Sequence, residues 1–145
     1  MQVVHNDLNP HNVLVHPRDH DRVAGIIDFG DTVRTALVVD VAVGASYLVD
    51  ATGDPLAHPL AFVGAYHRTR ALGPDELAVL HDLIVARWCT AILVMSWRAA
   101  RHPENRDYIL RNSARAISGI EAFERVDRTE AAARLAAACE PGAPR

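Results

Sequence analysis

The sequence predicts an α+β domain, mostly α, with a small β-hairpin near its N-terminal end. Two apolar runs, 13–15 and 23–27, flank a polar turn rich in Pro, Asp and His, a pattern typical of a hairpin. From residue 36 onward, apolar residues recur at the three- and four-residue spacing of amphipathic helices. Half of the 145 residues are apolar, so the sequence predicts one domain with one hydrophobic core.

Charge and cysteine content indicate which partners and which cellular compartment to expect. A net charge of −3 indicates neither a nucleic-acid partner nor an anionic membrane. Cys89 and Cys139 are too few for a disulfide framework and lack metal-ligand spacing, so we expect a reducing cytoplasm. We expect no signal peptide. The longest uncharged apolar run, 88–97, is shorter than the roughly 20 residues that span a bilayer, so we expect no membrane partner.

The N-terminal part is expected to alternate strands and polar loops. A strand at 2–4 leads into a polar loop from His5 to Asn12, and the hairpin follows. An acidic loop at 28–31 leaves the second hairpin strand, and 32–35 is expected to be a short link. The hairpin therefore brings the two loops together at one end of a small sheet.

The remainder reads as helices separated by breaks. The segment 36–49 is apolar almost all round, which predicts a buried helix. Gly and Pro end one helix and open the next at 73–74. The predicted helices are 36–49, 56–72, 75–101, 104–125 and 128–139, and 140–145 is expected to be a loose tail.

The two loops carry a set of oxygen-bearing side chains. Asn12 and Asp28 offer the oxygen ligands that Mg2+ prefers, with substrate phosphates completing its coordination. Asp7, on the same loop as Asn12, is a candidate base facing a substrate hydroxyl. Phosphoryl transfer needs this combination of a positioned acceptor, a base and metal ions that neutralise phosphate oxygens.

The spacing of these residues matches a known family. The pattern from His5 through Asp7 to Asn12, followed by Asp28-Phe29-Gly30, resembles the catalytic and metal motifs of the aminoglycoside phosphotransferase and choline kinase family, which shares the protein-kinase fold. The motif His-Asn-Asp-Leu-Asn-Pro-His-Asn is most similar to the corresponding motif of a bacterial branch related to hydroxylysine kinase. The similarity continues through the Val-Asp-Val-Ala sequence at 39–42.

The resemblance implies a C-terminal lobe. It would span 1–139, with the catalytic loop at 5–12, the metal loop at 28–31 and a helical subdomain at 36–139. Related kinases carry an N-terminal lobe with a Gly-rich loop over ATP and a strand Lys. This sequence has no G-x-G-x-x-G pattern and all fifteen basic residues are Arg, so we expect the nucleotide lobe to be absent from it.

The implied activity is transfer of a phosphoryl group from ATP, with Mg2+, to a small hydroxyl-bearing acceptor. The acceptor would be an amine-containing metabolite or an aminoglycoside. The main alternative is a catalytically inactive kinase-like module that pairs with a separate N-lobe chain or with a second copy. Metal-assisted hydrolysis by the same acidic residues is a third hypothesis.

The resemblance also assigns roles to single residues. Asp7 would be the catalytic base, although it could instead cap a turn. Asn12 and Asp28 would be the Mg2+ ligands, although Asn12 could instead hydrogen-bond its own loop. Asp31 is a candidate for a second metal, for a substrate amine or for the backbone of the next turn. His5 would brace the two loops by hydrogen bonds. Its alternative role as a transition-metal ligand is disfavoured by the oxygen donors around it.

Several residues of the helical part have expected partners. Asp40 lies inside an apolar helix and must be paired or hydrogen-bonded, so we expect it to hold the catalytic loop. Arg87 and Arg98 lie on the apolar stripe of the long helix. We expect a buried ion pair, with Asp40 as candidate partner of Arg87, or alternatively contact with a substrate carboxylate. Trp88 and Trp97 are expected to pack in the core rather than to form a cation–π cage.

Overall fold

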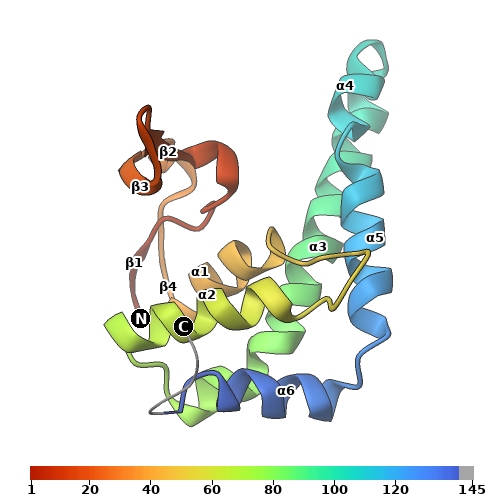
Figure 1. Cartoon of the computed structure of the whole chain (residues 1–145). Helices are drawn as coiled ribbons and strands as arrows, with labels where there is room; N and C mark the ends of the chain where they lie inside the picture. Colours follow the sequence, from red (N-terminus) through yellow and green to blue (C-terminus); the bar gives the residue numbers. More distant parts are fainter. Residues whose placement is uncertain (141–145) are drawn as a thin grey trace.

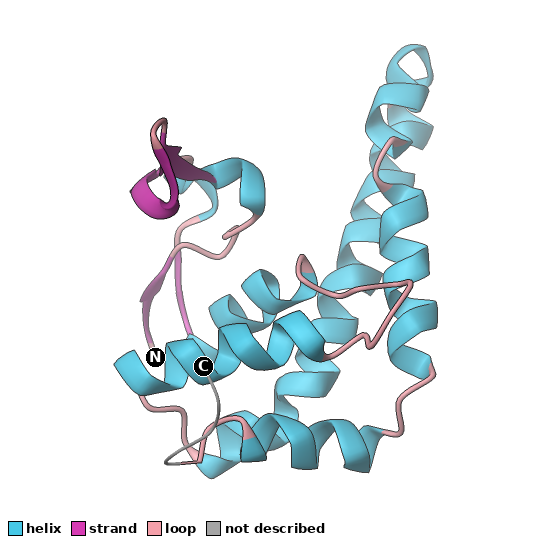
Figure 2. Ribbon diagram, viewed as in Figure 1, coloured by secondary structure: helices cyan, strands magenta, loops and turns pink. Residues whose placement is uncertain are grey.

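A computed structural model describes residues 1–140; the end of the predicted tail, 141–145, lies outside the described residues. Two small strand pairs stand beside a larger helical part (Figures 1 and 2). The mostly helical class with small strand pairs is therefore confirmed. The strands are β1 (Gln2–Val4), β2 (Val13–His16), β3 (Asp19–Ile26) and β4 (Val33–Thr35). The helices are α1 (Leu37–Ser46), α2 (Ala57–Thr69), α3 (Pro74–Arg101), α4 (Arg106–Leu110), α5 (Ser113–Glu124) and α6 (Arg128–Ala137).

The predicted hairpin is present as β2 and β3. It pairs antiparallel with Val13 opposite Ile26, and its register shifts on either side of Val15. The expectation of a short link at 32–35 is wrong, because this segment contains β4, which pairs antiparallel with β1. The unpaired backbone groups of β1 require hydrogen-bond partners, and β4 supplies them. The described strands thus form two two-stranded sheets rather than one.

Helix starts follow local chemistry that the sequence displays. At α3, the Glu76 carboxylate accepts a 2.8 Å hydrogen bond from the Gly73 N–H, and Pro74 occupies the first turn, where its missing N–H costs nothing. At α6, the Asp127 carboxylate accepts from the backbone amides of Thr129 and Glu130 at 2.8 and 3.1 Å. Both starts satisfy amides that otherwise lack partners.

The single helix expected at 104–125 is wrong. The segment divides into a 3-10 turn at Pro103–Asn105, then α4 and α5. At the break, the Ser113 hydroxyl donates to the Leu110 carbonyl at 2.7 Å, and the Arg111 guanidinium donates to the Tyr108 carbonyl at 2.8 Å. Side chains that bond nearby carbonyls compete with the helical ladder, so the apolar periodicity continues across an interrupted backbone.

The core is built around α3. This helix contacts α1, α4, α5 and α6, and Leu80 and Ile84 are fully buried on it. Trp88 packs edge-on against Phe123 of α5, with ring centroids 5.4 Å apart. A Cβ added at Gly119 would lie 2.8 Å from the Trp88 ring. The absence of a side chain at Gly119 therefore lets α5 approach α3 closely, and Trp88 packs as predicted.

Helix α3 is also long and apolar enough, by length and composition, to cross a membrane. An 18-residue window within it has a mean hydropathy of 1.8, although the longest uncharged run in the sequence is much shorter. Length and composition do not distinguish a membrane span from the central helix of a folded domain, and here α3 contacts four other helices.

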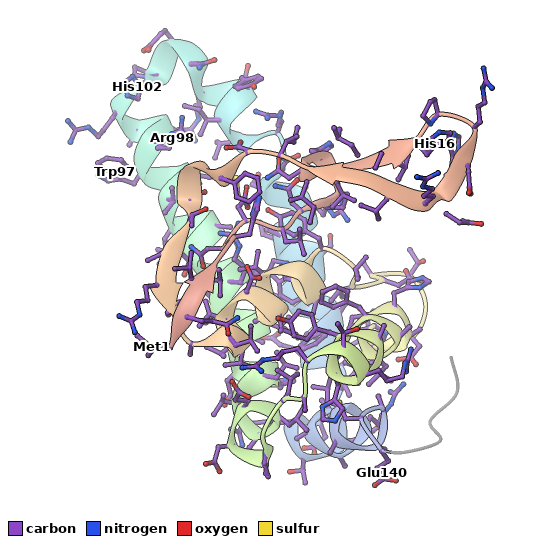
Figure 3. The ribbon with its side chains drawn as sticks, turned by 90° about the vertical axis from the view of Figure 1, so that its left-hand side faces the viewer. Met1, His16, Trp97, Arg98, His102 and Glu140 are labelled. Carbon is purple, nitrogen blue, oxygen red and sulfur yellow. The ribbon has the colours of Figure 1, made fainter. Side chains whose placement is uncertain are left out.

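The far end of α3 differs from the prediction. Trp97 is 59% exposed rather than packed, and the Arg101 guanidinium lies 5.0 Å from its ring centroid. Arg98 is exposed and makes no ion pair within residues 1–140. Figure 3 shows both side chains near this end of α3, well away from His16 at the tip of the hairpin. Ala99, two residues beyond Trp97, is only 1% exposed, so this end of α3 is covered on one face, and Trp97 and Arg98 lie outside the covered part.

Candidate active site

The loop between β1 and β2 is anchored to the helical part through its backbone. The Asn6 N–H donates a 2.6 Å hydrogen bond to Oδ1 of Asp40, which lies on α1. Asn6 adopts a left-handed conformation with φ of 64°, which asparagine tolerates better than most residues. The carboxylate inside the apolar helix therefore has a partner, and that partner is the loop.

Asp7 lies next in the chain, and its carboxylate accepts three side-chain hydrogen bonds. Oδ2 accepts from Nδ2 of Asn9 at 2.9 Å and from Nδ2 of Asn12 at 3.1 Å. Oδ1 accepts from Nη2 of Arg87 at 3.0 Å. The Asp7 side chain is 20% exposed, so it is held in place and still open to solvent on one side.

The ion pair of Arg87 corrects one expectation. Its partner is Asp7, not Asp40, whose Oδ1 accepts from the Asn6 backbone instead. Arg87 is also 26% exposed rather than fully buried. Its Nη2 additionally donates to the Tyr47 hydroxyl at 3.3 Å. The arginine of the long helix thus lies directly against the candidate base.

His5 connects the two loops. Its Nε2 donates to the Ile27 carbonyl at 2.9 Å, and its Nδ1 accepts from the Asp7 N–H at 3.3 Å. These two bonds together require the neutral tautomer with the proton on Nε2. The imidazole ring centroid also lies 4.9 Å from that of Phe29. His5 thereby ties the residue before Asp28 and the residue after it to the Asp7 loop.

Asn12 and Asp28 lie at the same end of the hairpin. The Ile27 N–H donates to the Asn12 carbonyl at 3.0 Å, so the residue next to Asp28 pairs with Asn12. The Asn12 side chain donates through Nδ2 to Asp7, and within residues 1–140 nothing donates to its amide oxygen. Asp28 has φ of 62°, and its carboxylate accepts a 3.4 Å bond from the Gly30 N–H.

The donor set fits a hard divalent cation. An amide oxygen and a carboxylate are ligands of the kind that Mg2+ takes, together with water and substrate phosphates. Within residues 1–140 there is no group of three His, Cys, Asp or Glu side chains that could hold a metal by themselves. The left-handed backbone of Asp28 is a strained conformation for a residue with a side chain, and such strain clusters at functional sites. Asp31 is exposed and, in this part of the chain, makes no side-chain hydrogen bond.

Sequence reasoning missed two residues of this network. Asn9 caps the 3-10 turn at Pro10–Asn12, with its Oδ1 accepting from the His11 N–H at 2.8 Å. The Asn-Pro pair was a usable signal, since asparagine before proline favours a turn. Tyr47, at the C-terminal end of α1, carried no local signal because its contact with Arg87 joins residues 40 positions apart.

A cavity of about 220 Å3 adjoins the network between α1 and α3. Its walls are mostly aliphatic, and Arg87 is the one charged residue among them. The lining residues are Asn6, Val39, Ala42, Val43, Leu83, Ala86, Arg87 and Thr90.

Comparison with known proteins identifies the family of this chain. The model of the phosphotransferase enzyme family matches residues 1–80. The chain belongs to the phosphotransferase enzyme family. The matched stretch of this family member includes the Asp7 loop, Asp28, Asp40 and Tyr47, and it ends before Arg87.

Vertebrate hydroxylysine kinases are among the relatives of this family member. It is 25% identical over 115 residues to hydroxylysine kinase of Danio rerio, covering 78% of this chain and 32% of that protein. It is 26% identical over 112 residues to hydroxylysine kinase of Bos taurus, covering 73% and 30%. The chain thus spans about a third of the length of these relatives. No solved structure matches it significantly.

Proposed function

We propose that this chain forms the acceptor- and metal-binding part of an ATP-dependent small-molecule phosphotransferase, corresponding to a kinase-like C-terminal lobe. One observation carries the proposal: the Asp7 carboxylate is held on three side chains, beside the end of the hairpin that carries Asn12 and Asp28. Family membership supports the same chemistry.

Each residue of the site has a proposed task. Asp7 accepts a hydrogen bond from the acceptor hydroxyl and orients it toward the phosphoryl group. The Asn12 amide oxygen and the Asp28 carboxylate hold Mg2+. The bound ion would supply the positive charge that neutralises phosphate oxygens. His5 and Asp40 keep the two loops in register, and Asp31 is a candidate for a second ion or a substrate amine.

The proposed acceptor is a small hydroxyl-bearing, amine-containing molecule. The relatives are named hydroxylysine kinases, which makes a hydroxylated amino acid one member of this class, and aminoglycosides are another. We propose a cytoplasmic setting, since Cys89 and Cys139 are both free thiols.

Nucleotide binding by the chain alone is expected to be weak. In kinase-like enzymes a Gly-rich loop and a Lys grip the phosphates of ATP, and these 145 residues contain neither. We therefore expect little or no turnover from the purified chain. Transfer activity that depends on Mg2+ and ATP and disappears in Asp7→Ala would contradict this expectation.

Calorimetry of ATP binding in the presence of Mg2+ tests the proposed metal role. We expect weak heat of binding in the wild type, its loss in Asp28→Ala, and no change in Asp21→Ala, which removes an exposed carboxylate elsewhere on β3. Equal binding by wild type and Asp28→Ala would refute the metal role of Asp28. Binding without added Mg2+ would refute a metal-dependent site.

A second candidate function is a kinase-like module that pairs with another chain. The observation in its favour is a set of large apolar side chains left exposed on the strands, on the 28–31 loop and on α3, including Val3, Val23, Phe29, Leu93 and Trp97. Exposed apolar surface of this kind marks interaction sites. Light scattering distinguishes the two cases at the level of this chain, since a stable dimer favours the module and a monomer favours the enzyme part.

A further inference from the structure

A chain of polar contacts joins three helices to the carboxylate of Asp7. We propose that Arg87, itself held by Tyr47, is a positioning residue for Asp7. The catalytic meaning of this role rests on the proposed function, whereas the positioning itself is a property of the folded chain that can be measured without activity.

The contacts converge on a single nitrogen of the guanidinium group. Nη2 of Arg87 donates to Oδ1 of Asp7 at 3.0 Å and to the hydroxyl of Tyr47 at 3.3 Å. The guanidinium carbon lies 5.9 Å from the Tyr47 ring centroid. Arg115, on α5, donates through Nη2 to the Tyr47 carbonyl at 2.8 Å. Tyr47, which directly follows α1, is therefore bonded by arginines of both α3 and α5, and Arg87 extends this set of contacts to Asp7.

The other two bonds to the Asp7 carboxylate are local. Asn9 and Asn12 belong to the same loop as Asp7 and move with it. Among residues 1–140, Arg87 is the one side chain from the helices that bonds the Asp7 carboxylate. The Asn6–Asp40 bond anchors the loop backbone to α1, and Arg87 adds a direct link from α3 to the Asp7 carboxylate itself.

The hydrogen bonds to the Asp7 carboxylate leave one acceptor position free. A carboxylate offers about four acceptor positions on its two oxygens. Two on Oδ2 and one on Oδ1 are occupied by these contacts. The free position is on Oδ1, the oxygen that Arg87 holds, so the rotamer set by Arg87 decides where an acceptor hydroxyl is bound.

Arg87 affects the orientation of the Asp7 side chain more than the free energy of unfolding. Both side chains are partly exposed, at 20% and 26%, and exposed ion pairs add little to the free energy of unfolding. Lysine would keep the charge at this position, but its side chain lacks the planar guanidinium that lies near the Tyr47 ring. Arg87 also lies beyond the stretch that the family model matches.

The side-chain rotamer of Asp7 is the quantity to measure. In the 13C,15N-labelled chain, three-bond couplings from the backbone nitrogen and carbonyl carbon to Cγ of Asp7 report its χ1 angle. We expect one rotamer in the wild type and averaged couplings in Arg87→Met. Arg98→Met is the matched control, because Arg98 is an exposed arginine of the same helix, and its couplings should equal those of the wild type. Arg87→Lys should give intermediate values.

Unchanged Asp7 couplings in a folded Arg87→Met would overturn the proposal, as would averaging of equal size in Arg98→Met. If Arg87→Met does not fold, Tyr47→Phe replaces it, since it removes only the hydroxyl that Arg87 contacts; partial averaging supports the proposal and unchanged couplings refute it. Calorimetry with Mg2+ and ATP on the same samples separates the two claims. If the wild type itself does not bind nucleotide, this result counts against the proposed function, and the rotamer result is unaffected.

Discussion

The strand region, residues 1–35, and the helical region, residues 37–137, differ in how many of their apolar side chains are buried. In the helical region buried apolar side chains meet around α3, among them Leu80, Ile84 and Phe123. In the strand region only Val4 and Asn12 are buried among the described residues. Its apolar side chains on the hairpin, such as Val23 at 59% exposed, face outward.

The helical region therefore contributes most of the stability, and the strand region carries most of the candidate site. Burial of apolar area is the main favourable contribution to folding, and the helical region supplies nearly all of it. The strand region carries the polar loops, which are joined to the helices by the Asn6–Asp40 and Asp7–Arg87 contacts and by the packing of β1 on α1. The candidate site is thus a polar structure mounted on a separate apolar core.

The largest expected effect is on the core. Ile84→Ala should lower the free energy of unfolding by about 2–5 kcal/mol, because it leaves a cavity beside α3. Val23→Ala, a truncation on the exposed face of the hairpin, should change it by at most about 0.5 kcal/mol. Urea unfolding followed by circular dichroism measures both. Similar losses in the two variants would show that the hairpin contributes to the core and would break the comparison.

A smaller effect is expected at the link between the regions. Asp40→Ala leaves the Asn6 N–H without its carboxylate partner, at a cost of about 1–3 kcal/mol. Because the loop is separate from the core, most of this cost should appear as local opening. Hydrogen exchange should accelerate at Asn6 and Asp7 and stay nearly unchanged at the α3 amides. Asp19→Ala, at the start of β3, is the control. Equal acceleration throughout α3 would mean that the two regions unfold as one unit.

The smallest effect is expected on the surface of the helical region. Hydrogen bonds from Arg128 and then His81 hold the pKa of Asp82 well below its usual range. A carboxylate with a lowered folded-state pKa stabilises the fold above its unfolded pKa, near 3.8, and this contribution is lost as the pH falls through the folded value. The Asp82 and Arg128 side chains are exposed, at 48% and 64%, so the effect on the free energy of unfolding at neutral pH should be close to the error of measurement.

Urea midpoints of the wild type and Asp82→Asn at a series of acidic pH values test this linkage. The small advantage of the wild type should be constant above about pH 5 and should shrink progressively below about pH 4. An advantage that grows on acidification would contradict the assignment of the lowered pKa to the folded state.

Local pattern was enough to predict much of this protein. The hairpin, the helices α1, α2, α3 and α6, and the family all follow from neighbouring residues and their spacing. Turn composition, apolar periodicity and helix-start residues such as Glu76 act over a few positions, and the sequence displays them directly. Asp7, Asn12 and Asp28 were also selected by spacing alone, and their roles remain proposals.

The tertiary structure decided what depends on distant residues. Arg87 bonds Asp7 rather than Asp40, and Val33–Thr35 is a strand because β1 lies beside it. Trp97 is exposed although Ala99, two residues further along α3, is buried, so this end of the helix is covered on one face only. Periodicity shows which side of a helix is apolar, but it does not show how far a neighbour extends along that side. An ion pair across 80 positions is chosen by the packing of α1 against α3, and no local pattern in the sequence contains that information.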